Sequence, residues 1–183
     1  PRLMRRVAMA LLIVAAARLP AQADKGIGIV ESASRKYEAL SSFQAQFRQH
    51  WEDRVAIGAD ESRGTIYQEG KNRLAMRWSD PPKEAIILDG TWLWLYLPST
   101  SPGEVKRFPQ QNHPTYGSNF VGTFLDNPVD RYRITYLKSE RIDGYVTDAV
   151  LMEPLPNTGL QFRRATVWLD RDLGLPRRLE IEE

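Results

Sequence analysis

The side chains that most often carry out chemistry in proteins are sparse here, and their spacing favours no particular reaction. Ser41 and Ser42 lack the Gly-x-Ser-x-Gly setting that exposes a nucleophilic serine. An acidic pair such as Asp60 and Glu61 could in principle act as acid and base, but adjacent acids are usually solvated side chains of turns or strand faces. The chain has no glycine-rich phosphate loop. We therefore expect a protein that is not an enzyme.

The chain has no cysteine and only two histidines, His50 and His113. Thiol nucleophiles and cysteine-based metal sites are excluded, and two histidines argue against a multi-histidine site. We expect neither a metal nor a cofactor. Because no disulfide can form, the fold must be stabilised by burying an apolar core.

The first residues have the layout of a secretory signal peptide. Two arginines precede an apolar run over residues 7–17, and a small-residue triplet ends at Ala23. A run of about 11 apolar residues is too short to cross a membrane, which needs roughly 20. We predict a signal peptide over residues 4–23, cleavage after Ala23 and a soluble mature protein in the periplasm. Asp24 follows, where a lipidated lipoprotein would present a cysteine.

Removal of this leader changes the charge of the chain. Four of the 25 basic residues lie in residues 1–23, so 21 remain beside 23 acidic ones, a net charge of −2 instead of +2. A nucleic-acid-binding domain needs a basic surface, and we expect no nucleic-acid partner. The remaining length suits one domain, which we predict over residues 24–183.

The apolar pattern predicts a helix followed by a series of strands. Apolar residues recur at helical spacing from Ile27 to Leu40, with charged residues between them. From Phe43 the period changes to two, which indicates a long strand with one face in water. Further strands are predicted over residues 64–68, 73–78, 85–88, 91–97, 132–137, 145–152, 160–169 and 178–181, and a short helix over 119–127.

Asp89-Gly90 is the strongest hairpin signal, because this pair readily forms a two-residue turn. Such a turn would pair Leu88 with Thr91. One face of the hairpin would carry Ala85, Ile87, Trp92, Trp94 and Tyr96, and the other Ile86, Leu88, Leu93, Leu95 and Leu97. Both faces are apolar, so each must be covered. The cover is either a helix on one side with a strand or loop behind, or a movable lid over an apolar cavity on the inner side of a curved sheet.

Several short motifs follow one another in a characteristic order. Their positions are Leu40-Ser-Ser-Phe-Gln-Ala-Gln-Phe-Arg-Gln49, Gly64-Thr-Ile-Tyr67, Arg77-Trp78, the run 88–98 ending in Trp-x-Tyr-x-Pro, the helix 120–128, and segments 151–154 and 167–170. This order covers nearly all of residues 27–182 and resembles the outer-membrane lipoprotein carrier family, the LolA-like proteins.

The resemblance implies a mostly β fold, a half-open antiparallel β-barrel whose concave face is covered by short helices. It implies a monomeric periplasmic chaperone that binds the acyl chains of lipoproteins in an apolar cavity. The cargo would come from an inner-membrane ABC-type lipoprotein-releasing transporter and pass to an outer-membrane acceptor. The carrier itself would need no metal, ATP or other cofactor.

We predict a lipid-binding cavity and a helical lid. The predicted lining residues are Phe43, Phe47, Met76, Trp78, Trp92, Trp94 and Tyr96, and the predicted lid residues are Phe120, Val121 and Phe124. The opposite hairpin face, with Ile86, Leu88, Leu93 and Leu95, is an alternative lining.

The chain departs from the family pattern in two places. The family commonly has an Arg-Pro step whose arginine latches the lid, and here the corresponding turn is Glu69-Gly70-Lys71-Asn72-Arg73 without proline. Either Arg73 or Lys71 could replace the latch, or both could be solvated turn charges. Family members also continue with further strands past Ile181, so we expect a C-terminally truncated domain.

Two other readings of the sequence remain open. One is a related half-barrel protein that binds a lipid or glycolipid, or senses the state of the cell envelope. The other is an exported hydrolase. The carrier and its relatives share a cavity, so the residues alone separate them poorly.

Overall fold

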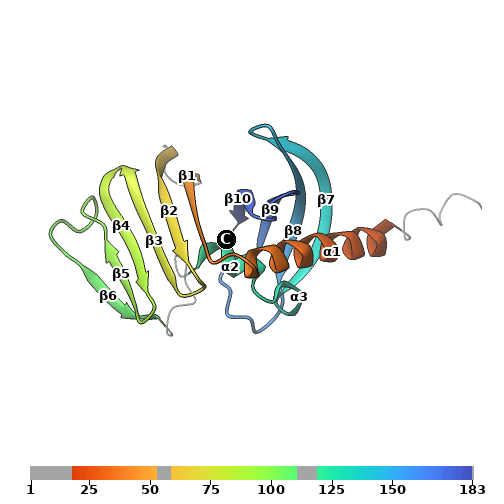
Figure 1. The fold of residues 1–183 in the computed structure, drawn as a ribbon, viewed down its shortest axis with the longest axis horizontal. Helices are drawn as coiled ribbons and strands as arrows, with labels where there is room; N and C mark the ends of the chain where they lie inside the picture. Colours follow the sequence, from red (N-terminus) through yellow and green to blue (C-terminus); the bar gives the residue numbers. More distant parts are fainter. Residues whose placement is uncertain (1–17, 53–58, 111–118, 183) are drawn as a thin grey trace, which may run out of the picture. The chain divides into compact units, whose positions relative to one another are not determined.

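A computed structural model describes residues 18–52, 59–110 and 119–182 (Figure 1). His113 and most of the predicted leader lie outside this part of the chain. The described residues form two compact units. One contains the residues up to Arg35, Asn127–Thr158 and those from Phe162 onward; the other contains Lys36–Asp126 and Gly159–Gln161.

The described chain is mostly β, as predicted, with few helices. The helices are α1 (Arg18–Glu38), α2 (Phe120–Leu125) and α3 (Pro128–Arg131). The strands are β1 (Ser42–Glu52), β2 (Ala59–Glu69), β3 (Arg73–Asp80), β4 (Pro82–Asp89), β5 (Trp92–Tyr96), β6 (Lys106–Pro109), β7 (Tyr132–Ile142), β8 (Tyr145–Pro154), β9 (Arg164–Asp170) and β10 (Pro176–Glu182).

The first six strands form one antiparallel sheet in sequence order, β1 to β6 (Figure 1). Each strand pairs with the strand that follows it along the chain, so short turns suffice to connect most of them. Side chains alternate between the two faces of such a sheet. The period-two pattern that begins at Phe43 is therefore the pattern of one face of this sheet.

The Asp89-Gly90 hairpin is present, but its predicted register is wrong by two residues. Leu88 pairs with Leu93 instead of Thr91. The Asp89 carboxylate accepts hydrogen bonds from the backbone N–H groups of Thr91 and Trp92, both at 2.8 Å. These bonds hold Thr91 and Trp92 in the connection between the paired residues Leu88 and Leu93, which is therefore longer than the predicted two-residue turn. A shift of two residues preserves the alternation, so the two predicted faces of the hairpin are correct.

The other unit contains a four-stranded antiparallel sheet in the order β10-β9-β8-β7, with α1 packed against it. A Cβ atom at Gly26 of α1 would lie 2.7 Å from the backbone nitrogen of Tyr136 and 3.1 Å from the Ile134 side chain. Only glycine permits this close approach. Met152 and Val167, both fully buried, belong to the core of this unit.

Some predicted boundaries differ from the observed ones. Helix α1 begins at Arg18 instead of Ile27, and Leu40 lies beyond its end with 40% of its surface exposed. Strand β6 and helix α3 are not among the predicted elements. Both are only four residues long, too short to show a period. In the described residues, no helix is long and apolar enough to span a membrane.

Candidate functional site

An apolar surface covers one face of the six-stranded sheet. Its centre is a buried cluster of Ile66, Leu74, Leu88 and Leu93. Partly buried apolar side chains pack around that cluster: Phe43, Phe47, Met76, Ile86, Leu95 and Phe108. The strand pairing brings all of these residues to the same face, which we call the apolar face.

The predicted cavity-lining residues do not all lie on this face. Three of them do: Phe43, Phe47 and Met76. Trp78 also lies on the apolar face, because it pairs with Gly64 and Gly64 pairs in turn with Phe47. Trp94 pairs with Ile87 and Arg107, on the opposite face. Trp92 and Tyr96 share the face of Trp94 because alternate residues of a strand point the same way. The prediction that these seven residues line one surface is therefore wrong.

The opposite face has a more polar environment. The guanidinium of Arg107 lies over the rings of Trp92 and Trp94, 4.3 and 5.5 Å from their centroids. The indole Nε1 of Trp94 donates a 2.7 Å hydrogen bond to the Asp89 carboxylate, and this bond is the main reason that the pKa of Asp89 is lowered. The alternative lining residues of the hairpin, including Ile86 and Leu95, are the ones on the apolar face.

A glycine makes room for an aromatic contact on the apolar face. The rings of Phe47 and Trp78 meet edge to face, with their centroids 5.3 Å apart. A Cβ atom at Gly64 would lie 2.8 Å from the Phe47 ring and would overlap the backbone oxygen of Arg77. The Phe47 ring thus occupies the space that a side chain at position 64 would need.

Helix α2 carries the three predicted lid residues. Phe124 and Val121 are 1% and 8% exposed, and the rings of Phe120 and Phe124 meet edge to face at 6.2 Å. Asn119 caps the helix, since its side-chain oxygen accepts a 2.8 Å bond from the backbone N–H of Gly122. The lid function of α2 stays a prediction.

A polar network joins α2 to the sheet and to the end of α1. The Tyr37 hydroxyl donates to the side-chain oxygen of Asn119 at 2.7 Å and accepts from Nε2 of Gln68 at 2.5 Å. Burial raises the pKa of Tyr37, despite the opposing effect of these hydrogen bonds. We call this set, together with Lys71 and Asp126, the lid network.

Lys71 in the β2–β3 turn contacts both ends of α2. Its backbone oxygen accepts a 3.2 Å hydrogen bond from Nδ2 of Asn119, and its ammonium lies 3.2 Å from the carboxylate of Asp126, the residue that ends the helix. A second carboxylate, that of Glu38, lies 3.5 Å from the same ammonium. The hydrogen bond to Asp126 is the main reason that the pKa of Lys71 is raised.

Arg73, the other candidate latch, makes a different contact. Its guanidinium lies 3.3 Å from the carboxylate of Glu69, its partner across the β2–β3 hairpin. Lys71, by contrast, bonds to α2. The latch role of either residue stays a prediction.

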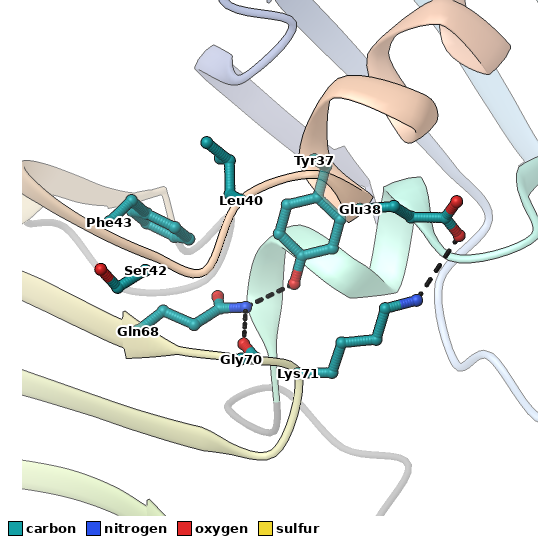
Figure 2. Close-up of a pocket in the computed structure, with 8 residues that line it drawn as sticks. All are labelled: Tyr37, Glu38, Leu40, Ser42, Phe43, Gln68, Gly70 and Lys71. Carbon is teal, nitrogen blue, oxygen red and sulfur yellow. Dashed lines mark hydrogen bonds and ion pairs between the residues drawn. The ribbon is translucent and has the colours of Figure 1, made fainter.

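A pocket lies beside the lid network (Figure 2). Its cavity volume is about 20 Å³, which is room for roughly one water-sized group. The residues that line it are Tyr37, Glu38, Leu40, Ser42, Phe43, Gln68, Gly70 and Lys71. Phe43 also packs against the cluster at the centre of the apolar face, so the pocket adjoins one end of that face.

Sequence reasoning missed Tyr37, Gln68, Asn119 and Asp126 as members of this site. In the sequence pattern, Tyr37 is only an apolar position of the helix. Gln68 carried a usable signal, because it follows Gly64 and Ile66 at alternate positions and is a polar residue on the apolar face. Among the described residues, no group of three or more metal-binding side chains is close enough to hold a metal ion.

No protein-family model and no curated protein sequence matches the chain. Solved structures do match in fold. An uncharacterized conserved protein from Thermus thermophilus has a TM-score of 0.54 and 10% identity, over 87% of this chain and 77% of that one. A putative outer membrane lipoprotein-sorting protein domain from Vibrio parahaemolyticus has a TM-score of 0.45 and 20% identity, over 87% and 72%.

A LolA superfamily protein from Nitrosomonas europaea also matches, with a TM-score of 0.39 and 18% identity over 85% of this chain and 70% of that one. At such identities the likeness concerns the fold alone. The chain is similar in structure, at low sequence identity, to LolA-superfamily and lipoprotein-sorting proteins, and its fold is mostly β with antiparallel sheets and few helices.

Proposed function

We propose that this protein is a periplasmic carrier that binds the acyl chains of lipoproteins. In this proposal, the carrier receives its cargo from an ABC-type transporter in the inner membrane and delivers it to an acceptor in the outer membrane. The half-open barrel, the monomeric state and the signal peptide cleaved after Ala23 belong to the same proposal.

The observation that carries the proposal is the extent of the apolar face. It runs across all six strands, and the side chains around its buried centre, including Phe43, Phe47 and Met76, are only partly buried. Each Å² of apolar surface removed from water contributes about 25 cal/mol. An acyl chain laid on this face would therefore bind favourably without any charged or catalytic group.

The attachment of α2 supports a lid. The helix has six residues and is joined to the β2–β3 turn by hydrogen bonds and an ion pair at its two ends. Opening α2 would expose the buried side chains of Val121, Phe124 and Leu125, so in this proposal bound cargo replaces the contacts that these side chains lose. The polar contacts can re-form after each opening, so α2 can close again once cargo has left.

Identification of co-purified lipids tests the function most directly. The full-length protein should be isolated from a native envelope and its bound lipids identified by mass spectrometry. Triacylated lipoproteins are the expected cargo. Recovery of other lipids or glycolipids alone would instead favour a related lipid-binding protein, and recovery of no lipid would contradict the proposal.

A matched pair of variants tests the binding surface. Phe47→Ala removes a ring from the apolar face, whereas Tyr67→Ala removes an exposed ring from the opposite face of the same sheet. Retention of a fluorescent acylated peptide should fall for Phe47→Ala and stay unchanged for Tyr67→Ala. Thermal unfolding of both variants shows whether any loss of binding reflects loss of the fold.

A further inference from the structure

The pocket beside the lid network contains a buried hydrogen-bond acceptor without a donor. Gln68 is 6% exposed, and its side-chain oxygen Oε1 is buried with no hydrogen-bond partner. The orientation of this amide follows from its neighbours. The Gly70 backbone oxygen, 2.8 Å away, can only accept, so the atom facing it must be the Nε2 donor.

The unpaired oxygen lies in a pocket that is apolar on one side (Figure 2). Nε2 of Gln68 is directed to Tyr37 and Gly70, and Oε1 is on the other side of the amide, among the remaining pocket residues. Leu40 and Phe43 supply the apolar wall. Because Phe43 also packs on the apolar face, a chain lying on that face can end at this acceptor.

The neighbouring charges indicate what kind of group can bind there. The ammonium of Lys71 already pairs with Glu38 and Asp126 and does not bond to Gln68. A buried acceptor left without a donor costs about 1–3 kcal/mol. A buried charge without a partner costs considerably more. The missing partner is therefore best supplied by an uncharged N–H or O–H group.

We propose that this pocket binds the uncharged hydrogen-bond donor at the head of an acyl chain, an amide N–H or a hydroxyl, through Oε1 of Gln68. The acyl chain then runs from Phe43 onto the apolar face. This proposal rests on the proposed lipid-binding function and adds to it a fixed orientation of the bound chain, with its head at the lid network.

Three probes with a monounsaturated hydrocarbon chain of the same length test the proposal. Oleamide carries N–H donors, oleyl alcohol carries an O–H donor, and methyl oleate carries none. Their affinities for the full chain are measured by displacement of the fluorescent dye N-phenylnaphthylamine. At least one donor-bearing probe should bind about tenfold more tightly than methyl oleate. Comparison of oleamide with oleyl alcohol then distinguishes an amide head from a hydroxyl head.

Three variants show whether Gln68 causes this preference. Gln68→Met removes the acceptor and keeps a side chain of similar size. The donor-bearing probes should then bind this variant about as tightly as methyl oleate does. Tyr37→Phe breaks the lid network but leaves the bond from Nε2 to Gly70, so the preference should persist. Gln44→Met makes the same change on the exposed opposite face of the sheet and should leave all three affinities unchanged.

The results separate this proposal from the proposed function. Equal binding of all three probes by the unaltered chain would overturn the Gln68 site and leave lipid binding standing. A preference that survives Gln68→Met would also overturn it. Failure of all three probes to bind would count against both proposals.

Discussion

The ammonium of Lys71 lies 3.2 Å from the carboxylate of Asp126, and this ion pair connects the β2–β3 turn to the residue that ends α2. The backbone oxygen of the same lysine bonds to Asn119 at the other end of the helix. A turn residue thereby contacts both ends of the proposed lid. Removal of its side chain should affect the lid more than the sheet.

We expect Lys71→Met to increase the opening of α2 with little effect on global stability. Lys71 is half exposed, and exposed ion pairs contribute about 1 kcal/mol or less. Hydrogen exchange of residues 119–126, followed by mass spectrometry, should become faster. Arg73→Met is the control, because Arg73 pairs with Glu69 within the hairpin. Equal effects of the two variants on the helix would argue against a specific latch.

Phe124→Glu separates a lid from a static core helix. Phe124 is 1% exposed, so the closed helix would bury an unpaired carboxylate. If α2 is a lid, it opens to expose the charge, and retention of a fluorescent acylated peptide is lost while most of the thermal stability remains. Cooperative unfolding of the variant, without a separate loss of binding, would identify α2 as a core element.

The two faces of the six-stranded sheet should respond differently to a bound lipid. Trp78 lies on the apolar face, and Trp94 lies on the opposite one. Single-tryptophan variants that retain one or the other should be mixed with an acyl chain that carries bromine, a short-range quencher of indole fluorescence. We expect quenching of Trp78 only. Stronger quenching of Trp94 would place the lipid on the other face.

Gly64→Ala should destabilise the sheet. The added methyl group would overlap the Arg77 backbone oxygen, and overpacking of this kind typically costs about 1–3 kcal/mol. Gly28→Ala is the matched control, because no atom lies within 4 Å of a Cβ at that exposed position of α1. That change should stabilise the protein by about 0.5–1 kcal/mol. Denaturant unfolding measures both effects, and similar stability of the two variants would contradict the close packing at Gly64.

The Asp148–Arg171 ion pair should make stability depend on pH in acid. The hydrogen bond from Arg171, 2.7 Å from Asp148, is the main reason that the pKa of this carboxylate is lowered. A depressed pKa in the folded state stabilises the fold above the unfolded pKa, about 3.9, and this contribution is lost as pH falls through the folded value. Denaturant unfolding should show that, in Asp148→Asn, the free energy of unfolding depends less strongly on pH below about pH 4.

Local sequence patterns were sufficient for much of the secondary structure and for which residues share a face. A helix through Val30 and Ala33 and a strand through Phe43 and Phe47 follow from apolar periods of 3.6 and two. The two faces of the Asp89 hairpin followed from alternation in the same way. The assignment of residues to the two faces is correct although the predicted register is wrong by two residues, because an even shift leaves every side chain on its original face.

The arrangement of the site depended on contacts between distant parts of the chain. Alternation does not say which hairpin face joins Phe43, and only the pairing across β2, β3 and β4 placed Leu88 there and Trp94 opposite. Lys71 bonds to the ends of α2 and Arg73 does not, and this too depends on where α2 lies relative to the β2–β3 turn. Gln68 Oε1 became a candidate binding group only because it is buried without a hydrogen-bond donor, and burial is a property of the packed structure.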